Sequence, residues 1–209
     1  MGDSNNITWT SSGTVPDDLV LEYSILGSNF TGATSIATGE SDDGTYAWTI
    51  PDQDQNDVRV RVRSASAPAI NDMSDADFTV ADIAVTSPNG SEQFQVGNSH
   101  NITWNADANV PDDLILEYTK DDTNYTSIAT GVTASDETYA WTVPDDASDS
   151  VKVRIRSSSA SDLTDSSDAN FKMSKLNITA PNGGESWIVD TSNDITWEYD
   201  SLISDVKLE

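Results

Sequence analysis

Cysteine is absent from this 209-residue chain, and histidine occurs once, as His100. Without cysteine no disulfide can hold the fold, so any core must be stable by packing alone. A Ser-His-Asp arrangement would have to use His100, but the equivalent positions of the repeats described below carry Asn5 and Asn193. We therefore expect no catalytic residues and no enzymatic activity.

Positive charge is scarce as well. The chain has ten Lys and Arg residues and 36 Asp and Glu residues, so its formal net charge is −26. This excess repels phosphate backbones, and we expect no nucleic-acid partner. Long apolar runs are missing too, which predicts no membrane insertion in this stretch of chain. An acidic surface with little lysine is typical of extracellular surface proteins and of proteins that bind divalent cations.

What the chain does contain is an internal repeat. The motif Asn-Ile-Thr-Trp ends at Trp9 and Trp104, and Asp-Ile-Thr-Trp ends at Trp197, at spacings of 95 and 93 residues. A period of about 94 residues fits one small sandwich domain. We predict a first repeat at 1–81 that lacks its first strand segment, a complete second repeat at 82–174, and the N-terminal part of a third repeat at 175–209, called the third segment below.

Within each repeat, short alternating segments are separated by turn residues. Thr-Tyr-Ala-Trp-Thr occurs at 45–49 and 138–142, and Val151–Arg156 alternates apolar and basic side chains with a period of two. No segment shows a helical period. The sequence therefore predicts an all-β fold of tandem immunoglobulin/fibronectin-III-like antiparallel β-sandwiches, with Trp48 and Trp141 in their cores.

Most of the basic residues gather on two equivalent strands. Glu22 and Glu117 point outward from another strand that could lie beside them in the same sheet. We favour cross-strand Glu–Arg pairs over an anion-binding site, because the surrounding acidic residues would weaken anion binding. The six basic residues are Arg59, Arg61, Arg63, Lys152, Arg154 and Arg156.

Calcium is the one ligand for which we find candidate residues, and we expect no other cofactor. The ion takes about six to eight oxygen ligands, which Asp and Asn in loops can supply. Adjacent Asp residues on extended chain point apart, so one pair cannot chelate alone and a solvated turn is the favoured interpretation. The candidate metal ligands are Asp17, Asp18, Asp82, Asp112, Asp113, Asp145 and Asp146.

N-glycosylation is a second candidate chemistry. Asn29 and Asn124 occupy equivalent predicted turns, where an acceptor can be reached, and they are our candidate glycosylation sites. The other Asn-x-Ser/Thr sequences begin at Asn6, Asn89, Asn101 and Asn177.

The motifs 101–104, 138–144, 151–156 and 167–171 together resemble the Ser-Thr-rich GPI-anchored (KNH-type) cell-wall repeat family, which also occurs in tandem in large surface proteins. This resemblance implies an extracellular or cell-surface location and no shared catalytic residue. We expect a structural spacer module whose partners are neighbouring repeats of the same chain or fibre. Two alternatives remain: an adhesion module that binds a glycan or protein ligand, and a fibre subunit completed by strand donation.

Overall fold

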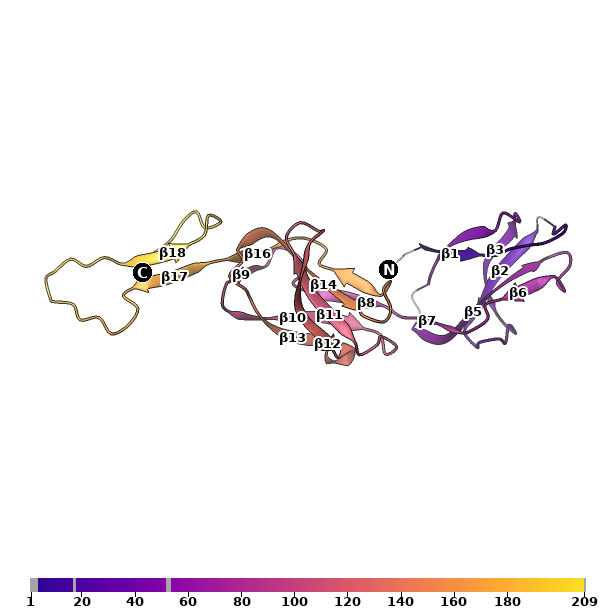
Figure 1. The fold of residues 1–209 in the computed structure, drawn as a ribbon, viewed down its shortest axis with the longest axis horizontal. Coiled ribbons are helices and arrows are strands. Elements are labelled where there is room, and N and C mark those ends of the chain that lie inside the picture. The colour runs from indigo at the N-terminus through magenta and orange to yellow at the C-terminus, as the bar shows by residue number, and fades with distance from the viewer. Residues whose placement is uncertain (1–3, 17, 52–53, 209) are drawn as a thin grey trace. The chain divides into compact units, whose positions relative to one another are not determined.

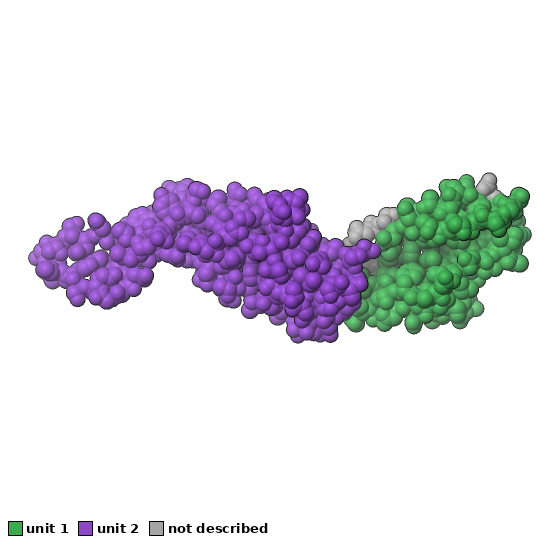
Figure 2. Space-filling model, in the orientation of Figure 1, with its two compact units in different colours: residues 1–82, 107–110 green, residues 83–106, 111–209 purple. Residues whose placement is uncertain are grey.

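The structure is a computed structural model that describes residues 4–16, 18–51 and 54–208. These residues form β-strands and one short 3-10 helix, η1 (Ala134–Asp136) (Figure 1). Contacts divide the chain into two compact units, residues 1–82 with 107–110 and residues 83–106 with 111–209 (Figure 2). The described part of the chain contains no helix long and apolar enough to cross a membrane. The predicted all-β fold is confirmed, while the repeat boundaries at 81 and 174 stay predictions.

The first repeat builds two sheets. Among the described strands, β1 pairs only with β4, and the larger sheet runs in the order β3-β2-β5-β6 with β7 also paired to β5. All these pairs are antiparallel. The strands are β1 (Ser4–Thr8), β2 (Leu19–Ser24), β3 (Thr34–Glu40), β4 (Thr45–Thr49), β5 (Gln55–Ser64), β6 (Asn71–Met73) and β7 (Phe78–Val80).

The second repeat has the same strands and two more. One sheet runs β13-β10-β8, and the other runs β12-β11-β14-β16-β9 with β15 also paired to β14. The pair β9–β16 is parallel, which alternation within single strands could not indicate. The strands are β8 (Ile83–Ser87), β9 (Gln93–Gln95), β10 (Ser99–Ala106), β11 (Leu114–Thr119), β12 (Tyr125–Val132), β13 (Thr138–Thr142), β14 (Ser148–Ser157), β15 (Thr164–Ser166) and β16 (Phe171–Ser174).

The third segment forms a two-stranded antiparallel sheet of β17 (Leu176–Ala180) and β18 (Thr196–Tyr199). The stretch 206–208 forms no strand. Its counterpart β11 is held between β12 and β14. In the third segment the described sheet consists of β17 and β18 alone.

The core of the second repeat follows the predicted parity. Val151, Val153 and Ile155 of β14 point inward and are 0% exposed. Trp104 of β10 is 1% exposed, and its indole Nε1–H donates to the Ala134 carbonyl oxygen at 2.8 Å. A buried indole N–H needs such an acceptor, so the loop that contains η1 contributes to the stability of the core.

Two short strands were missed in the sequence. β6 and β15 lie within Ser- and Asp-rich stretches, and each pairs with the long strand before it. β15 is entirely polar and β6 has one apolar residue, Met73, so neither shows an apolar alternation and only the backbone of the neighbouring strand defines them.

Candidate functional site

The outer faces of both repeats carry a cluster of two arginines around one glutamate. In the second repeat, Glu117 of β11 lies opposite Arg154 of β14 in the ladder. Arg154 donates from Nε at 3.0 Å and from Nη2 at 2.6 Å, and Arg156 donates from Nε at 3.1 Å, all to Glu117 Oε2. The period of two places Arg154 and Arg156 on the same face, so one carboxylate can bind both.

The first repeat repeats this arrangement. Arg61 donates to Glu22 Oε1 from Nε at 2.8 Å and from Nη2 at 2.5 Å, and Arg63 donates from Nε at 2.8 Å. Burial alone raises the pKa of Glu22, but the hydrogen bonds and positive charges of the two arginines outweigh it and hold the pKa below its usual value. The predicted cross-strand Glu–Arg pairs are confirmed in both repeats.

An aromatic ring covers one guanidinium in each cluster. Arg154 Cζ lies 3.4 Å from the centroid of the Tyr125 ring, and Arg61 Cζ lies 4.3 Å from the centroid of the Phe30 ring. These are cation–π contacts. Our sequence analysis missed them, although both rings stand directly after the equivalent residues Asn29 and Asn124.

The remaining basic residues of the two strands are also paired. Arg59 Nε lies 2.5 Å from Asp77, and Lys152 Nζ lies 3.5 Å from Asp122. Carboxylates of the protein therefore occupy the positions that a bound anion would need. This arrangement favours a structural role for the charged face over anion binding.

Two of the candidate calcium ligands stabilise equivalent loops instead. Asp18 accepts hydrogen bonds from Ser64 Oγ at 2.9 Å and from the Ser66 backbone N–H at 2.7 Å. Asp113 accepts from Ser157 Oγ and Ser158 Oγ, both at 2.8 Å. Hydrogen bonds from serine hydroxyls, that of Ser159 foremost, lower the pKa of Asp113 to about 2.

Other candidate acids have separate partners. Asp112 accepts from the Ala134 backbone N–H at 2.8 Å. Asp145 accepts from Lys175 Nζ at 2.9 Å, and Asp146 accepts from Lys120 Nζ and from the Tyr118 hydroxyl. The structure thus distributes these carboxylates among different contacts.

The last two candidates complete the set. Asp82 donates its backbone N–H to Asp107 Oδ2 at 2.8 Å, and Asp17 lies outside the described residues. Across residues 4–16, 18–51 and 54–208, no three His, Asp or Glu side chains gather closely enough to hold a metal ion. Calcium binding stays a prediction, and the contacts of these acids favour structural roles.

The two candidate glycosylation sites lie on exposed turns. Asn29 follows β2, and its Oδ1 accepts from the Thr31 N–H at 3.1 Å. Asn124 precedes β12, and its Nδ2 donates to Asp121 Oδ2 at 2.6 Å. Of the other sequons, Asn89 is half-buried, while Asn6, Asn101 and Asn177 are exposed strand residues. Their modification stays a prediction.

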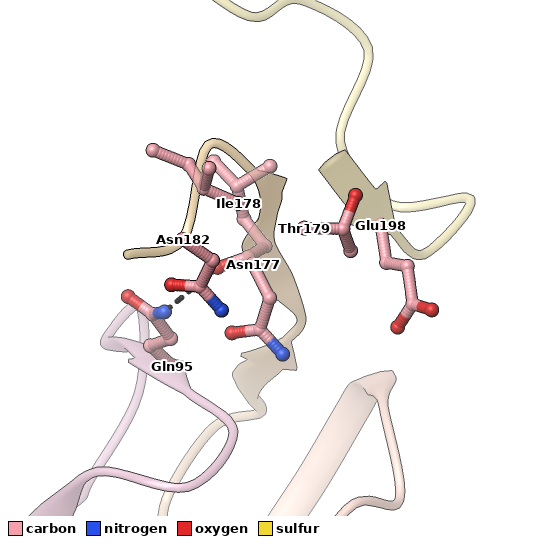
Figure 3. A pocket seen from close by; sticks show the side chains of 7 residues that line it. Gln95, Asn177, Ile178, Thr179, Asn182 and Glu198 are labelled. Atoms are coloured by element: carbon pink, nitrogen blue, oxygen red, sulfur yellow. Dashed lines mark hydrogen bonds between the residues drawn. The ribbon is translucent and has the colours of Figure 1, made fainter. Parts of the chain in front are cut away.

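A polar hollow opens beside β17 (Figure 3). Gln95 Nε2 donates to the Leu176 carbonyl oxygen at 2.9 Å at its edge. The hollow is open, and its lining offers amides and one carboxylate with no nucleophile–base pair. It is lined by Gln95, Leu176, Asn177, Ile178, Thr179, Asn182 and Glu198.

The single histidine is a packing residue. The His100 ring stacks on Phe94 with centroids 4.0 Å apart and an interplanar angle of 7°. Its Nε2 is buried and has no hydrogen-bond partner among the described residues. A general base must lie within hydrogen-bond reach of the group that gives up its proton, and the buried Nε2 has no such partner among the described residues.

A family model described as the Kre9/KNH-like N-terminal Ig-like domain matches residues 87–169. This match supports the KNH-type family. It runs across the second repeat from the end of β8 to the residues before β16, and it agrees with the Ig-like sandwich seen there. Among solved structures, the chain is similar to the fibronectin(III)-like modules of Clostridium thermocellum CbhA, with 14% identity, 82% of this chain and 85% of that chain covered, and a TM-score of 0.30. No curated relative matches the chain.

Proposed function

We propose that this chain is a non-enzymatic spacer segment of an extracellular or cell-surface repeat protein. The polar groups best suited to binding or catalysis are already engaged with other groups of the same repeat. Guanidinium groups bind carboxylates, loop aspartates bind serine hydroxyls, and the histidine stacks on a phenylalanine. Few of its groups are therefore left to position a substrate. We expect such a module to bear mechanical load and to separate its neighbours.

The connection between the second repeat and the third segment carries this proposal. Only Lys175 separates β16 from β17. The Lys175 backbone N–H donates to the Asp200 carboxylate, and the Asp200 N–H donates back to the Lys175 carbonyl oxygen at 3.2 Å. Its Nζ lies 2.9 Å from Asp145 in the second repeat and 3.8 Å from Glu198 in the third segment. A one-residue connection held on both sides supports a stiff joint.

The equivalent backbone contacts occur at Asp82, which corresponds to Lys175. The Asp82 N–H donates to Asp107 Oδ2 at 2.8 Å, and the Asp107 N–H donates to the Asp82 carbonyl oxygen at 3.1 Å. Because Asp107 corresponds to Asp200, the same pair of hydrogen bonds recurs one period earlier. The same backbone hydrogen bonds at the starts of the second repeat and of the third segment support a regular spacing between neighbouring modules.

The adhesion alternative has less support. It needs exposed aromatic rings that a sugar can stack on. Strand parity leaves Phe30, Tyr125 and Tyr199 outside the core. Phe30 and Tyr125 are stacked on arginines, whereas Tyr199 is 58% exposed. We therefore place ligand binding second to the spacer role.

Nuclear magnetic relaxation of backbone 15N tests the spacer proposal. A stiff joint predicts that β17 and β18 tumble with the same correlation time as β14 and β16. Lys175→Ala should loosen the third segment, whereas Lys152→Ala, which removes an ion pair away from this joint, should not. Independent tumbling of β17 and β18 in the unmodified chain would contradict the proposal. Saturable binding on a glycan array would favour the adhesion module instead.

A further inference from the structure

The second repeat holds an early strand and its last strand side by side. β9 and β16 form a parallel pair, with Phe94 opposite Met173. The chain enters this repeat at β8, which leads into β9, and it leaves the repeat directly after β16. Figure 1 shows β8 toward one end of the repeat and β9 and β16 toward the other. A pull along the chain would therefore draw β9 back toward the entry and β16 forward toward the exit.

The direction of the two strands decides how such a pull acts on them. Parallel strands that are pulled from opposite ends slide along each other, so all the hydrogen bonds between them resist together. Strands that are pulled from the same end separate one hydrogen bond at a time. β9 is pulled from its N-terminal end and β16 from its C-terminal end, so this pair has the stronger geometry. At its two ends the Lys172 N–H donates to the Glu92 carbonyl oxygen and the Val96 N–H to the Ser174 carbonyl oxygen, both at 2.9 Å.

The turn before β9 is also fastened to the loop before β16. The Asn89 Nδ2–H donates to Asp168 Oδ2 at 2.8 Å, and Asn89 Oδ1 accepts from the Asp168 backbone N–H at 2.6 Å. One side chain thus makes two hydrogen bonds to one residue, and one of its partners is a carboxylate. We call the contacts between the turn 88–92 and the loop 167–170 the turn lock.

The turn lock is closely packed. Ser167 is 2% exposed, and its hydroxyl donates to the Pro88 carbonyl oxygen at 2.7 Å. Gly90 has a φ of 133°, and a Cβ at this position would lie 2.7 Å from the Ala169 Cβ. Glycine is therefore required for the turn to approach the loop this closely.

A glutamate gives the turn its shape. Glu92 Oε1 accepts from the Asn89 N–H at 2.8 Å, and its Oε2 accepts from the Gly90 N–H at 2.7 Å. Glu185 makes the same two bonds in the third segment, at 2.7 and 2.8 Å, although residues 181–190 are all exposed there. The turn thus keeps its shape without packing against a loop. Glu92 therefore preorganises the half of the turn lock that carries Asn89.

Apolar packing supports the strand pair from its inner face. Phe94 is 9% exposed, and Phe171 and Met173 are 0% exposed. The rings of Phe94 and Phe171 lie with their centroids 5.3 Å apart. Sliding β9 along β16 would have to break these contacts and the hydrogen bonds between the strands at the same time.

We propose that the turn lock and the β9–β16 pair form a tension-bearing clamp that resists stretching of the second repeat. Pro-Asn-Gly-x-Glu at 88–92 supplies one half of the clamp, and Ser-Asp-Ala-x-Phe at 167–171 supplies the other. Two motifs that recur in the sequence are thereby given a common role. The purpose of the clamp rests on the proposed spacer role, whereas its strength is a property of the second repeat that can be measured separately.

Single-molecule force spectroscopy of the full chain tests the clamp. The chain contains no cysteine, so thiols introduced by Asp82→Cys and Lys175→Cys attach handles on either side of the second repeat alone. Unfolding at constant force reports the unfolding rate rather than the equilibrium free energy. Asn89→Ala, which removes both side-chain bonds to Asp168, should raise this rate about tenfold or more.

Glu117→Gln is the matched control. It removes a charged acceptor from two arginines, but it lies on β11, which is neither the entry nor the exit strand of the repeat. Contacts that are still intact when the clamp breaks do not change the unfolding rate. This variant should therefore lower the equilibrium stability and leave the unfolding rate under force within about twofold of that of the unmodified chain.

The direction of pulling provides a second test, which keeps Asn89, Glu92 and Asp168 in place. Ser91 and Asn170 are exposed and directly precede β9 and β16 by one or two residues. Handles attached through Ser91→Cys and Asn170→Cys pull the two strands from the same end. The repeat should then yield at a lower force than with handles at positions 82 and 175.

The proposal fails on any of three results. Equal unfolding forces in the two pulling directions would show that strand direction does not matter. An unchanged rate in Asn89→Ala would remove the turn lock from the clamp. Equal acceleration in Glu117→Gln and Asn89→Ala would indicate a general loss of stability. None of these results depends on the tumbling of β17 and β18, so the clamp and the spacer role can fail separately.

Discussion

The two repeats share their sequence motifs but differ in how their cores are closed. Trp48 in the first repeat and Trp141 in the second are both buried, because each lies between strands that both repeats contain. Trp9 is half-buried, whereas Trp104 is 1% exposed. The Arg–Glu–Arg clusters are alike in both repeats, because each depends only on two adjacent strands. Contacts between neighbouring strands are therefore preserved, while burial depends on a strand that comes from elsewhere in the chain.

The indole nitrogens show the same difference. Trp104 Nε1 donates to a buried backbone carbonyl, whereas Trp9 Nε1 donates to Asp42 Oδ1 at 2.9 Å. Hydrogen bonds from the Ser11 hydroxyl and this indole lower the pKa of Asp42 below its usual value. In the partly open core of the first repeat, the tryptophan indole N–H therefore donates to a charged surface group.

The largest effect that we expect separates the two repeats. Trp104→Ala should lower the free energy of unfolding of the second repeat by about 3–5 kcal/mol, because it removes a fully buried indole and leaves a cavity. Trp9→Ala should lower that of the first repeat by roughly 1–2 kcal/mol, because part of the indole already contacts water. Urea unfolding followed by hydrogen exchange can assign each loss to its repeat. Equal losses would show that the two cores are closed to the same degree.

An intermediate effect should be the same in both repeats. Glu22→Gln and Glu117→Gln should each lower the free energy of unfolding by about 1.5–3 kcal/mol, because charged hydrogen bonds from two arginines are lost. Chemical denaturation measures this at neutral pH. The similar cluster geometry predicts values within error of each other, and Glu137→Gln on an exposed turn serves as the control. A large difference between the repeats would mean that closure of the core also governs the clusters.

The same variants have a defined pH dependence. The pKa of Glu22 and of Glu117 in the folded state lies below the usual value of 4.5. The stabilisation from each is therefore complete above about pH 4.5 and is lost as the pH falls below it. Acid titration of the unfolding free energy should show this loss in the unmodified chain and a smaller loss in each Gln variant. Identical acid profiles would contradict it.

The smallest effect concerns the rings over the arginines. Tyr125→Ala and Phe30→Ala should each cost about 0.5–1 kcal/mol, as for partly exposed cation–π pairs. The loss should be larger for Tyr125, because its ring centroid is 3.4 Å from the guanidinium carbon and that of Phe30 is 4.3 Å away. Thermal unfolding measures both. Leucine at either position keeps the apolar area but lacks the aromatic ring. Full stability in the leucine variants would show that the cation–π contact contributes nothing.

Sequence reasoning succeeded where one strand carries the whole signal. The period of two in Val151–Arg156 predicted which side chains face the core and which face outward, and the structure confirms it. The Glu–Arg pairing followed from the same parity with one further assumption about adjacent strands. That assumption was confirmed, since β11 pairs with β14 and β2 pairs with β5, although two other strands lie between the members of each pair in the chain.

It failed where a feature depends on strands far apart in the chain. The parallel pair β9–β16 joins residues about 79 positions apart, and no local pattern records such a distance. The serine hydroxyls that bind Asp18 and Asp113 come from the end of the partner strand, so these aspartates looked like solvated turn residues or metal ligands. Composition alone cannot distinguish aspartates that bind a metal ion from aspartates that make such loop contacts.

The amino-acid sequence by itself determined the strand content, the repeat and the side of each strand that turns inward, because these depend on side chains two residues apart. Only the tertiary structure decided which tryptophans are enclosed, which carboxylates are already bound and which strand edges stay open. Those properties depend on which strands become neighbours, and the chain brings them together from positions that no short pattern connects.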